Sequence, residues 1–168
     1  SMGNPVTCST QFPLDAASPI KDKDGKSVVQ SMRTGGFAEK VLVHESQCVT
    51  VPKNIKMASA SLLACGVITG FGAVTNTAKV PAGSHVVVIG TGGVGLNSIQ
   101  GAHVSGARTV VAIDVVDSKI EAAKSFGATH GINSKTEDVA ARVLELTGGH
   151  GADYVFVTVG VKSAFDSS

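Results

Sequence analysis

The stretch HVVVIGTGGVGLNSIQGA, residues 85–102, decides the fold of this chain. A run of β-branched residues comes first, as in a buried strand. Three glycines at the spacing G-x-G-x-x-G follow, and after them comes an apolar segment with the spacing of a helix. This order predicts a strand, a tight turn and a helix, which together form the opening unit of an α/β sheet.

The three glycines of the turn, Gly90, Gly92 and Gly95, each meet a different steric need. Gly90 permits the tight turn, Gly92 lets a pyrophosphate approach the backbone without meeting a Cβ, and Gly95 lets the helix pack close to the strand. The start of the helix offers free N–H groups and partial positive charge, which stabilise an anion by about 0.3–1 kcal/mol per contact at an exposed site. The pattern therefore predicts a nucleotide-binding turn, which also includes Gly93.

Asp114 ends the second predicted strand, about 20 residues after the last glycine of the turn, where an acid can bind a ribose. A carboxylate accepts hydrogen bonds from the ribose hydroxyls and would repel a 2′-phosphate, so NAD is favoured over NADP. Lys119, about one helical turn further on, could reach the same ribose, although a solvated lysine explains it equally well. Two alternatives stay open at this point: a purely structural turn, and an adenosine-cofactor methyltransferase with a similar turn and acid.

Alternating apolar segments extend this unit over the second half of the chain. The strands are near-continuous Val and Ile runs, which is typical of strands buried on both faces of a parallel sheet. We expect strands at 86–90, 109–114, 130–133 and 153–160, and helices at 94–105, 118–126 and 136–146. The predicted fold class is α/β with a doubly wound parallel sheet, and the sheet is expected to be incomplete because the full order has six strands.

The first half of the chain has weaker patterns. Residues 3–36 are rich in turn-forming residues and predict loops, while residues 37–52 alternate well enough for two short strands. Residues 57–78 carry apolar side chains at helical spacing together with three glycines. Because glycine weakens a helix, we expect two helices there with a break near Cys65 and Gly66.

Composition excludes several classes of function. The 168 residues carry 14 Lys and Arg against 13 Asp and Glu, and these charges are scattered, so we expect neither nucleic acid nor a membrane as a partner. The sequence suggests no apolar run long enough to span a bilayer, and a cytoplasmic protein is expected. The three cysteines form no C-x-x-C pair, which argues against a disulfide scaffold and a self-contained zinc finger. The motif G-x-x-x-x-G-K-[ST] does not occur, so nothing supports ATP or GTP hydrolysis.

The run LLACGVITGFGAVTNTAKVPAGSHVVVIGTGGVG, residues 62–95, resembles the zinc-dependent medium-chain alcohol dehydrogenase family, and so does GFAEKVLV, residues 36–43. The likeness extends over almost all of residues 7–165 and sets the methyltransferase alternative aside. It implies two domains. Residues 1–52 would be a small β remnant of a GroES-like catalytic domain, and residues 53–168 an NAD-binding Rossmann domain that stops after its fourth strand.

The resemblance also implies roles for individual residues. Cys65 resembles the third protein ligand of the family's catalytic zinc, Thr69 the threonine beside the nicotinamide ring, and Val94 the valine behind that ring. The other cofactor-binding residues that it implies are the glycines of the phosphate turn, the ribose pair and the end of the fourth strand: Gly90, Gly92, Gly93 and Gly95, Asp114 and Lys119, and Thr158 and Val159. No catalytic residue is assigned.

The chain also departs from the family pattern. The family's other two catalytic zinc ligands and its proton-relay residue lie before the position of Cys8, which itself resembles the last cysteine of a structural zinc lobe. Catalytic zinc usually has three protein ligands, so Cys65 alone is not expected to hold it. We expect part of an NAD- and zinc-dependent alcohol dehydrogenase that transfers hydride between a small-molecule alcohol or aldehyde and NAD, and that could form a homo-oligomer when intact. The alternative is a catalytically inactive NAD-binding or structural fragment.

Overall fold

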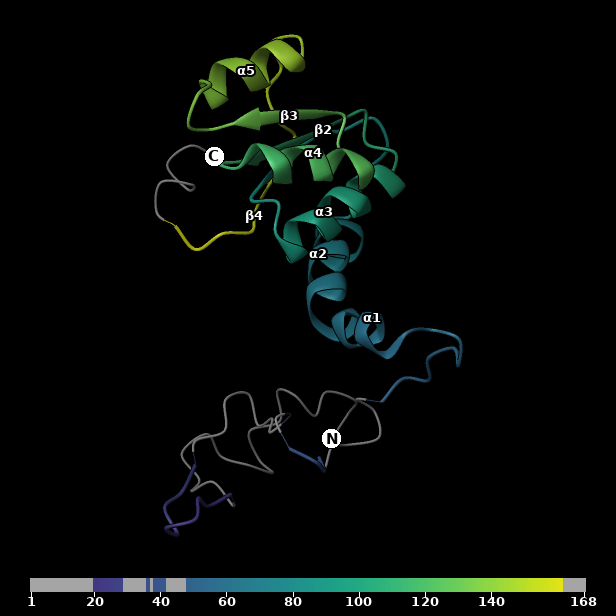
Figure 1. Cartoon of the computed structure of the whole chain (residues 1–168). Helices are drawn as coiled ribbons and strands as arrows, with labels where there is room; N and C mark the ends of the chain where they lie inside the picture. The colour runs from purple at the N-terminus through teal and green to yellow at the C-terminus, as the bar shows by residue number, and fades with distance from the viewer. Residues whose placement is uncertain (1–19, 29–35, 37, 42–47, 162–168) are drawn as a thin grey trace. The chain divides into compact units, whose positions relative to one another are not determined.

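The computed structural model describes residues 20–28, 36, 38–41 and 48–161, which Figure 1 draws in colour. The chain separates into two compact units that divide after Lys53, and each is described here by itself. The second unit contains the glycine-rich turn, the strands of the sheet and the helices of the described residues.

In the first unit, the run KDKDGKS, residues 21–27, forms a tight turn that an isolated antiparallel bridge between its two end residues closes. The Asp22 carboxylate accepts two backbone N–H groups within the turn, both at 2.9 Å. Gly25 has a φ of 78°, a conformation that glycine adopts without strain. This part of the predicted loop region is therefore an ordered hairpin turn.

The two strands predicted within residues 37–52 are not found in the described part of that segment, where residues 38–41 and 48–52 contain no strand. Residues 42–47 lie outside the described residues, and so does Cys8. A two-stranded unit is marginal in water unless it packs against a larger body. The two strands therefore stay a prediction for the part of the segment that lies outside the described residues.

The second unit is built on a four-stranded parallel sheet with the strand order β3-β2-β1-β4. This is the first part of the order 3-2-1-4-5-6 of dinucleotide-binding sheets, so the predicted α/β class and doubly wound topology are confirmed. The strands are β1 (His85–Ile89), β2 (Thr109–Asp114), β3 (His130–Asn133) and β4 (Tyr154–Val157).

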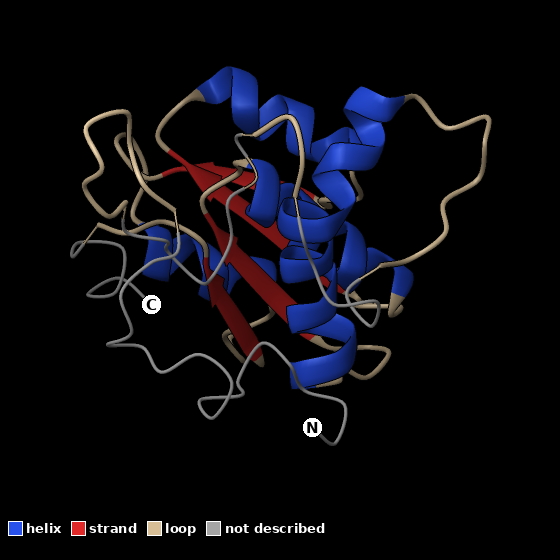
Figure 2. Cartoon of the chain, turned by 90° about the horizontal axis from the view of Figure 1, so that it is seen from below, coloured by secondary structure: helices blue, strands red, loops and turns tan. Residues whose placement is uncertain are grey.

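The sheet is buried on both faces, as its Val and Ile runs predict. One face packs with Ile99 and Ala102 of α3 (Gly93–Val104) and Ala123 of α4 (Asp117–Ser125). The other face packs against α5 (Val139–Leu146), and Figure 2 shows the strands between the helices. Each fully buried Val or Ile side chain contributes about 1.5–3 kcal/mol, so this core fixes the carboxyl ends of the strands in place.

The segment 57–78 is a single helical run, and the predicted break near Cys65 and Gly66 is wrong. It comprises α1 (Met57–Leu62), the π-helical η3 (Leu63–Val67), α2 (Ile68–Gly72) and the π-helical η4 (Ala73–Ala78), with right-handed helical backbone at each junction. Gly70 explains why glycine occurs there, because a Cβ on it would collide with the carbonyl oxygen of Val94. Gly70 therefore permits close packing of α2 on α3, which lie side by side in Figure 1.

The continuity of this run also corrects the expectation that the chain holds no apolar segment of membrane-spanning length. Met57–Ala78 has 22 residues and a mean hydropathy of 1.7 over its most apolar window, so length and composition alone would allow it to cross a membrane. A mostly buried core helix of a soluble protein passes the same test, whereas 11 % of this window is buried. Ser98 of α3 donates a hydrogen bond to the carbonyl of Gly70 at 3.2 Å, so this helix packs on the sheet domain.

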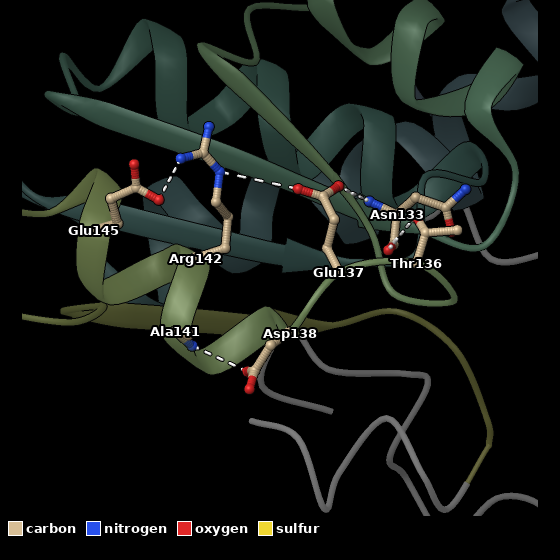
Figure 3. A network of polar contacts seen from close by, with 7 residues as sticks. All are labelled: Asn133, Thr136, Glu137, Asp138, Ala141, Arg142 and Glu145. Carbon is tan, nitrogen blue, oxygen red and sulfur yellow. Dashed lines mark hydrogen bonds and ion pairs between the residues drawn. The ribbon is translucent and has the colours of Figure 1, made fainter.

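Helix α5 begins three residues later than the predicted 136–146, because the preceding residues form a capped turn (Figure 3). Asp138 is the N-cap and accepts the N–H of Ala141 at 3.1 Å. The Glu137 carboxylate accepts the N–H of Asn133 at 2.9 Å, at the end of β3. Arg142 lies between Glu137 and Glu145 and pairs with both. The turn is therefore held by side chains that the periodicity of the segment does not reveal.

Candidate functional site

The glycine-rich turn lies at the carboxyl end of β1, between β2 on one side and β4 on the other. This is the topological switch point of the sheet, where ligands bind in open α/β folds. Gly90 has a φ of 92°, and its N–H donates to the Ile113 carbonyl at 2.7 Å. A Cβ on Gly90 would collide with Val159, so both the conformation and the space at this position require glycine.

The remaining glycines of the turn fall into two kinds. Gly95 is buried, and a Cβ there would collide with the carbonyl oxygen of Gly90, so helix and strand pack more closely than alanine would allow. Gly92 and Gly93 are exposed, and a Cβ on either would meet no atom within 4 Å. The space beside Gly92 and Gly93 is therefore open, and these are the two positions where a phosphate would approach the backbone.

Helix α3 presents its amino end to this open space. Gly92 is its N-cap, and no side chain caps the helix or places an acid in its first turn. The first N–H groups of a helix have no partner within the helix, and the helix dipole adds partial positive charge there. The geometry at Gly92 and Gly93 suits an anion, as the sequence predicts.

Asp114 lies at the end of β2 beside the turn and accepts four hydrogen bonds. Its Oδ2 accepts the N–H of Thr91 at 2.9 Å and the hydroxyl of Thr91 at 2.8 Å. Its Oδ1 accepts the N–H of Val115 at 2.8 Å and the N–H of Val116 at 3.2 Å. The second strand and the glycine turn are thus joined through one carboxylate.

The pKa of Asp114 lies below its usual value. Burial is the largest single influence and would raise the pKa, but it is outweighed by the hydrogen bonds from Thr91 and Val115 and by the positive charge of Lys119. The carboxylate is therefore ionised near neutral pH, which is the state that accepts hydrogen bonds from hydroxyls. Lys119 is exposed on α4, close enough to Asp114 for this electrostatic effect.

Thr158 and Val159 follow β4 and lie against the turn. The Thr158 hydroxyl lies within hydrogen-bond distance of two backbone carbonyl oxygens, that of Ile89 at 3.0 Å and that of Gly90 at 2.9 Å. Val159 fills the space beside Gly90. The structure thus brings both residues to the glycine turn, which the hydroxyl of Thr158 contacts from the β4 side.

Thr69 and Cys65 lie on the helical run that packs beside the start of α3. Gly66 approaches Gly93, with 4.0 Å between a Cβ built on Gly66 and the carbonyl carbon of Gly93, and Gly70 approaches Val94. The residues predicted to flank the nicotinamide, Thr69 and Val94, are therefore on adjoining elements. Their contacts with a cofactor stay a prediction.

Cys65 is an exposed free thiol within the π-helical segment η3. Within the described part of the chain, no three His, Cys, Asp or Glu side chains are close enough together to hold a metal ion. Catalytic zinc usually has three protein ligands. The described residues therefore do not form a zinc site by themselves, and the role of Cys65 as a ligand stays a prediction.

Thr91 is the residue of the site that the sequence analysis missed. It occupies an unspecified position of G-x-G-x-x-G, so the motif gives it no role. In the structure it is only 3 % exposed, and both its N–H and its hydroxyl bind Asp114. The sequence did offer one signal for this role: Thr91 is a hydroxyl residue in a turn that is expected to lie beside the Asp114 carboxylate.

Known proteins share this architecture. Residues 93–168 match the family model described as zinc-binding dehydrogenase. The structure is similar to that of an alcohol dehydrogenase zinc-binding domain protein from Burkholderia ambifaria, with a TM-score of 0.84 and 33 % identity over 99 % of this chain and 47 % of that one. The chain belongs to the zinc-dependent medium-chain alcohol dehydrogenase family.

Further relatives place this alcohol dehydrogenase family member among longer proteins. Benzyl alcohol dehydrogenase from Acinetobacter calcoaceticus has a TM-score of 0.80 and 35 % identity over 99 % of this chain and 46 % of its own. A probable S-(hydroxymethyl)glutathione dehydrogenase 1 from Schizosaccharomyces pombe is 41 % identical over 147 residues, which are 87 % of this chain and 38 % of that protein. The chain therefore spans less than half the length of these relatives.

Proposed function

We propose that this chain forms the NAD-binding part of a zinc-dependent alcohol dehydrogenase that transfers hydride between a small-molecule alcohol or aldehyde and NAD. One observation supports the proposal most. In a member of this family, the exposed Gly92 and Gly93 open onto free space next to an ionised Asp114 at the switch point of the sheet. A diphosphate at the turn and a ribose at the carboxylate match this pair of features.

The chain's own residues bind and orient the cofactor. The N–H groups at the start of α3 would hold the diphosphate, and the open positions at Gly92 and Gly93 would let it approach the backbone. Asp114 would accept hydrogen bonds from the adenosine ribose, with Lys119 nearby, and its negative charge would disfavour a 2′-phosphate. When bound, NAD supplies the hydride acceptor.

The helical run 57–78, which packs beside α3, would lie next to the nicotinamide ring of the cofactor. Thr69 and Val94 lie on adjoining elements where the resemblance implies the nicotinamide ring. Cys65, about one helical turn before Thr69, would be one ligand of a zinc ion. The described residues hold no further ligands around Cys65, so the other ligands of such an ion would come from outside them. A cytoplasmic location and a homo-oligomeric state stay predictions.

Titration with NADH tests the cofactor assignment. We expect the purified protein to bind NADH more tightly than NADPH, and Asp114→Ala to weaken NADH binding about tenfold or more, because a hydrogen bond to a charged group contributes roughly that factor. Glu121→Ala is the matched control, since Glu121 is an exposed acid on the neighbouring α4. Unchanged NADH affinity in Asp114→Ala would remove the proposed role of Asp114.

Turnover separates the enzyme from the alternative of an inactive binding module. Zinc-loaded protein is mixed with NAD and simple primary or aromatic alcohols, and NADH formation is followed by its absorbance. We expect alcohol-dependent NADH formation from the intact enzyme. NADH binding without any turnover of the full-length protein would favour the binding module.

A further inference from the structure

Thr91 connects the two halves of the candidate site. It lies in the turn between Gly90 and Gly92, and its N–H and its hydroxyl both donate to the same carboxylate oxygen, Oδ2 of Asp114, at 2.9 and 2.8 Å. Hydrogen bonds to an ionised acceptor are roughly twice as strong as neutral ones. The phosphate turn and the ribose-binding acid are therefore held to each other directly.

The hydroxyl of Thr91 differs from the other donors to Asp114 in one way. The remaining three donors are backbone N–H groups, which come from Thr91 itself and from Val115 and Val116. Backbone donors persist whatever side chain is present, whereas the hydroxyl is lost by a single substitution. Among the described hydrogen bonds of Asp114, it is the one that a side chain donates, and it holds the carboxylate together with the three N–H groups.

The hydroxyl approaches Asp114 from the interior of the domain. Thr91 is 3 % exposed, while Asp114 is only half-buried. Part of the Asp114 carboxylate therefore lies at the surface of the domain, and the Thr91 hydroxyl contacts it from the buried side. A buried side chain that fixes the rotamer of a ligand-binding group lowers the entropy lost on binding.

We propose that Thr91 is a positioning residue that holds the Asp114 carboxylate toward the adenosine ribose and so sets the preference for a dinucleotide with a free 2′-hydroxyl. This inference rests on the proposed function, since it assigns a specificity determinant to the same site. It predicts that the hydroxyl acts on the ribose end and not on the phosphates. Loss of the hydroxyl should therefore affect NADH and NADPH differently.

The test compares Thr91→Val, which keeps the shape and loses the hydroxyl, with Thr91→Ser, which keeps the hydroxyl. NADH and NADPH are titrated into the same sample of each purified full-length variant, followed by nicotinamide fluorescence. We expect Thr91→Val to bind NADPH as before and NADH up to about tenfold more weakly, which is the factor for loss of one charge-assisted hydrogen bond between Asp114 and the ribose. Thr91→Ser should retain the wild-type ratio of the two dissociation constants.

The ratio of the two dissociation constants does not depend on the folded fraction of the sample, because both ligands meet the same protein. Thr91→Ala serves as a second hydroxyl-free variant should Thr91→Val fold poorly. An unchanged ratio, an equal loss for both ligands, or tighter NADH binding in the hydroxyl-free variants would each overturn the positioning role. Wild-type protein that binds neither ligand would instead refute the proposed function.

Discussion

Substitution of Gly95 by alanine tests how closely α3 packs on the sheet. Gly95 is buried, the Gly90 carbonyl oxygen occupies the place of its Cβ, and the Thr158 hydroxyl would lie only 2.9 Å from that Cβ. Because the nearest atoms are backbone, they cannot move as a flexible side chain would. Overpacking of this kind costs about 1–3 kcal/mol. Because the collision is with backbone, the cost should be at the upper end, about 3 kcal/mol; alanine regains up to about 1 kcal/mol of helix propensity, so the free energy of unfolding should fall by about 2 kcal/mol.

Urea unfolding followed by circular dichroism measures this difference. Gly93→Ala is the matched control, since Gly93 is the first residue of the same helix and a Cβ there meets no atom within 4 Å. We expect Gly93→Ala to leave the midpoint unchanged or to raise it slightly through helix propensity. If Gly95→Ala were as stable as the wild type, or if both variants lost the same stability, the close approach of α3 to β1 would be refuted.

Three further outcomes follow from the same contacts. The pKa of Asp114 is lowered in the folded state, so its ionised form should stabilise the fold above pH 3.8, the usual aspartate value. This stabilisation should be lost as the pH falls through the lower folded pKa. The free energies of unfolding of wild type and Asp114→Asn should therefore converge in that acid range, and a constant difference would contradict the prediction. Thr158→Val should lower the free energy of unfolding by about 1 kcal/mol while Thr158→Ser retains it, because valine keeps the backbone N–H bond to the Ile89 carbonyl but loses the hydroxyl near the Ile89 and Gly90 carbonyls. Asp138→Ala should cost about 1 kcal/mol through loss of the α5 N-cap, and full retention of stability by thermal unfolding would rule out the cap.

The strands of the sheet could be predicted from the sequence because the signal for each strand lies in its own residues. Val and Ile runs with turn residues at each end mark strands buried on both faces, and β2 begins and ends at the predicted residues. The parallel order followed from the alternation of strands with helices. Where the signal depended on tertiary contact, prediction failed: glycines in 57–78 indicated a break, but Gly70 serves the packing of α2 against α3.

The candidate site shows the same division. That the motif glycines and Asp114 lie together could be predicted from their spacing, because the turn and the end of the second strand meet at the same edge of a parallel sheet. The contacts of Thr91 and Thr158 could not be predicted from spacing. Each depends on a hydroxyl that lies near an oxygen atom far away in the sequence, that of the Asp114 carboxylate for Thr91 and that of the Gly90 carbonyl for Thr158. Only the folded sheet brings these partners together.

We propose that the glycine turn and Asp114 together bind the diphosphate and ribose of a dinucleotide. Titration of the isotope-labelled protein with NADH, followed by amide chemical shifts, tests it residue by residue. We predict the largest changes at the amides of Gly92, Gly93 and Val94 and at Val115, which follows Asp114. Binding of NADH that left these amides unchanged and shifted residues elsewhere would contradict the claim.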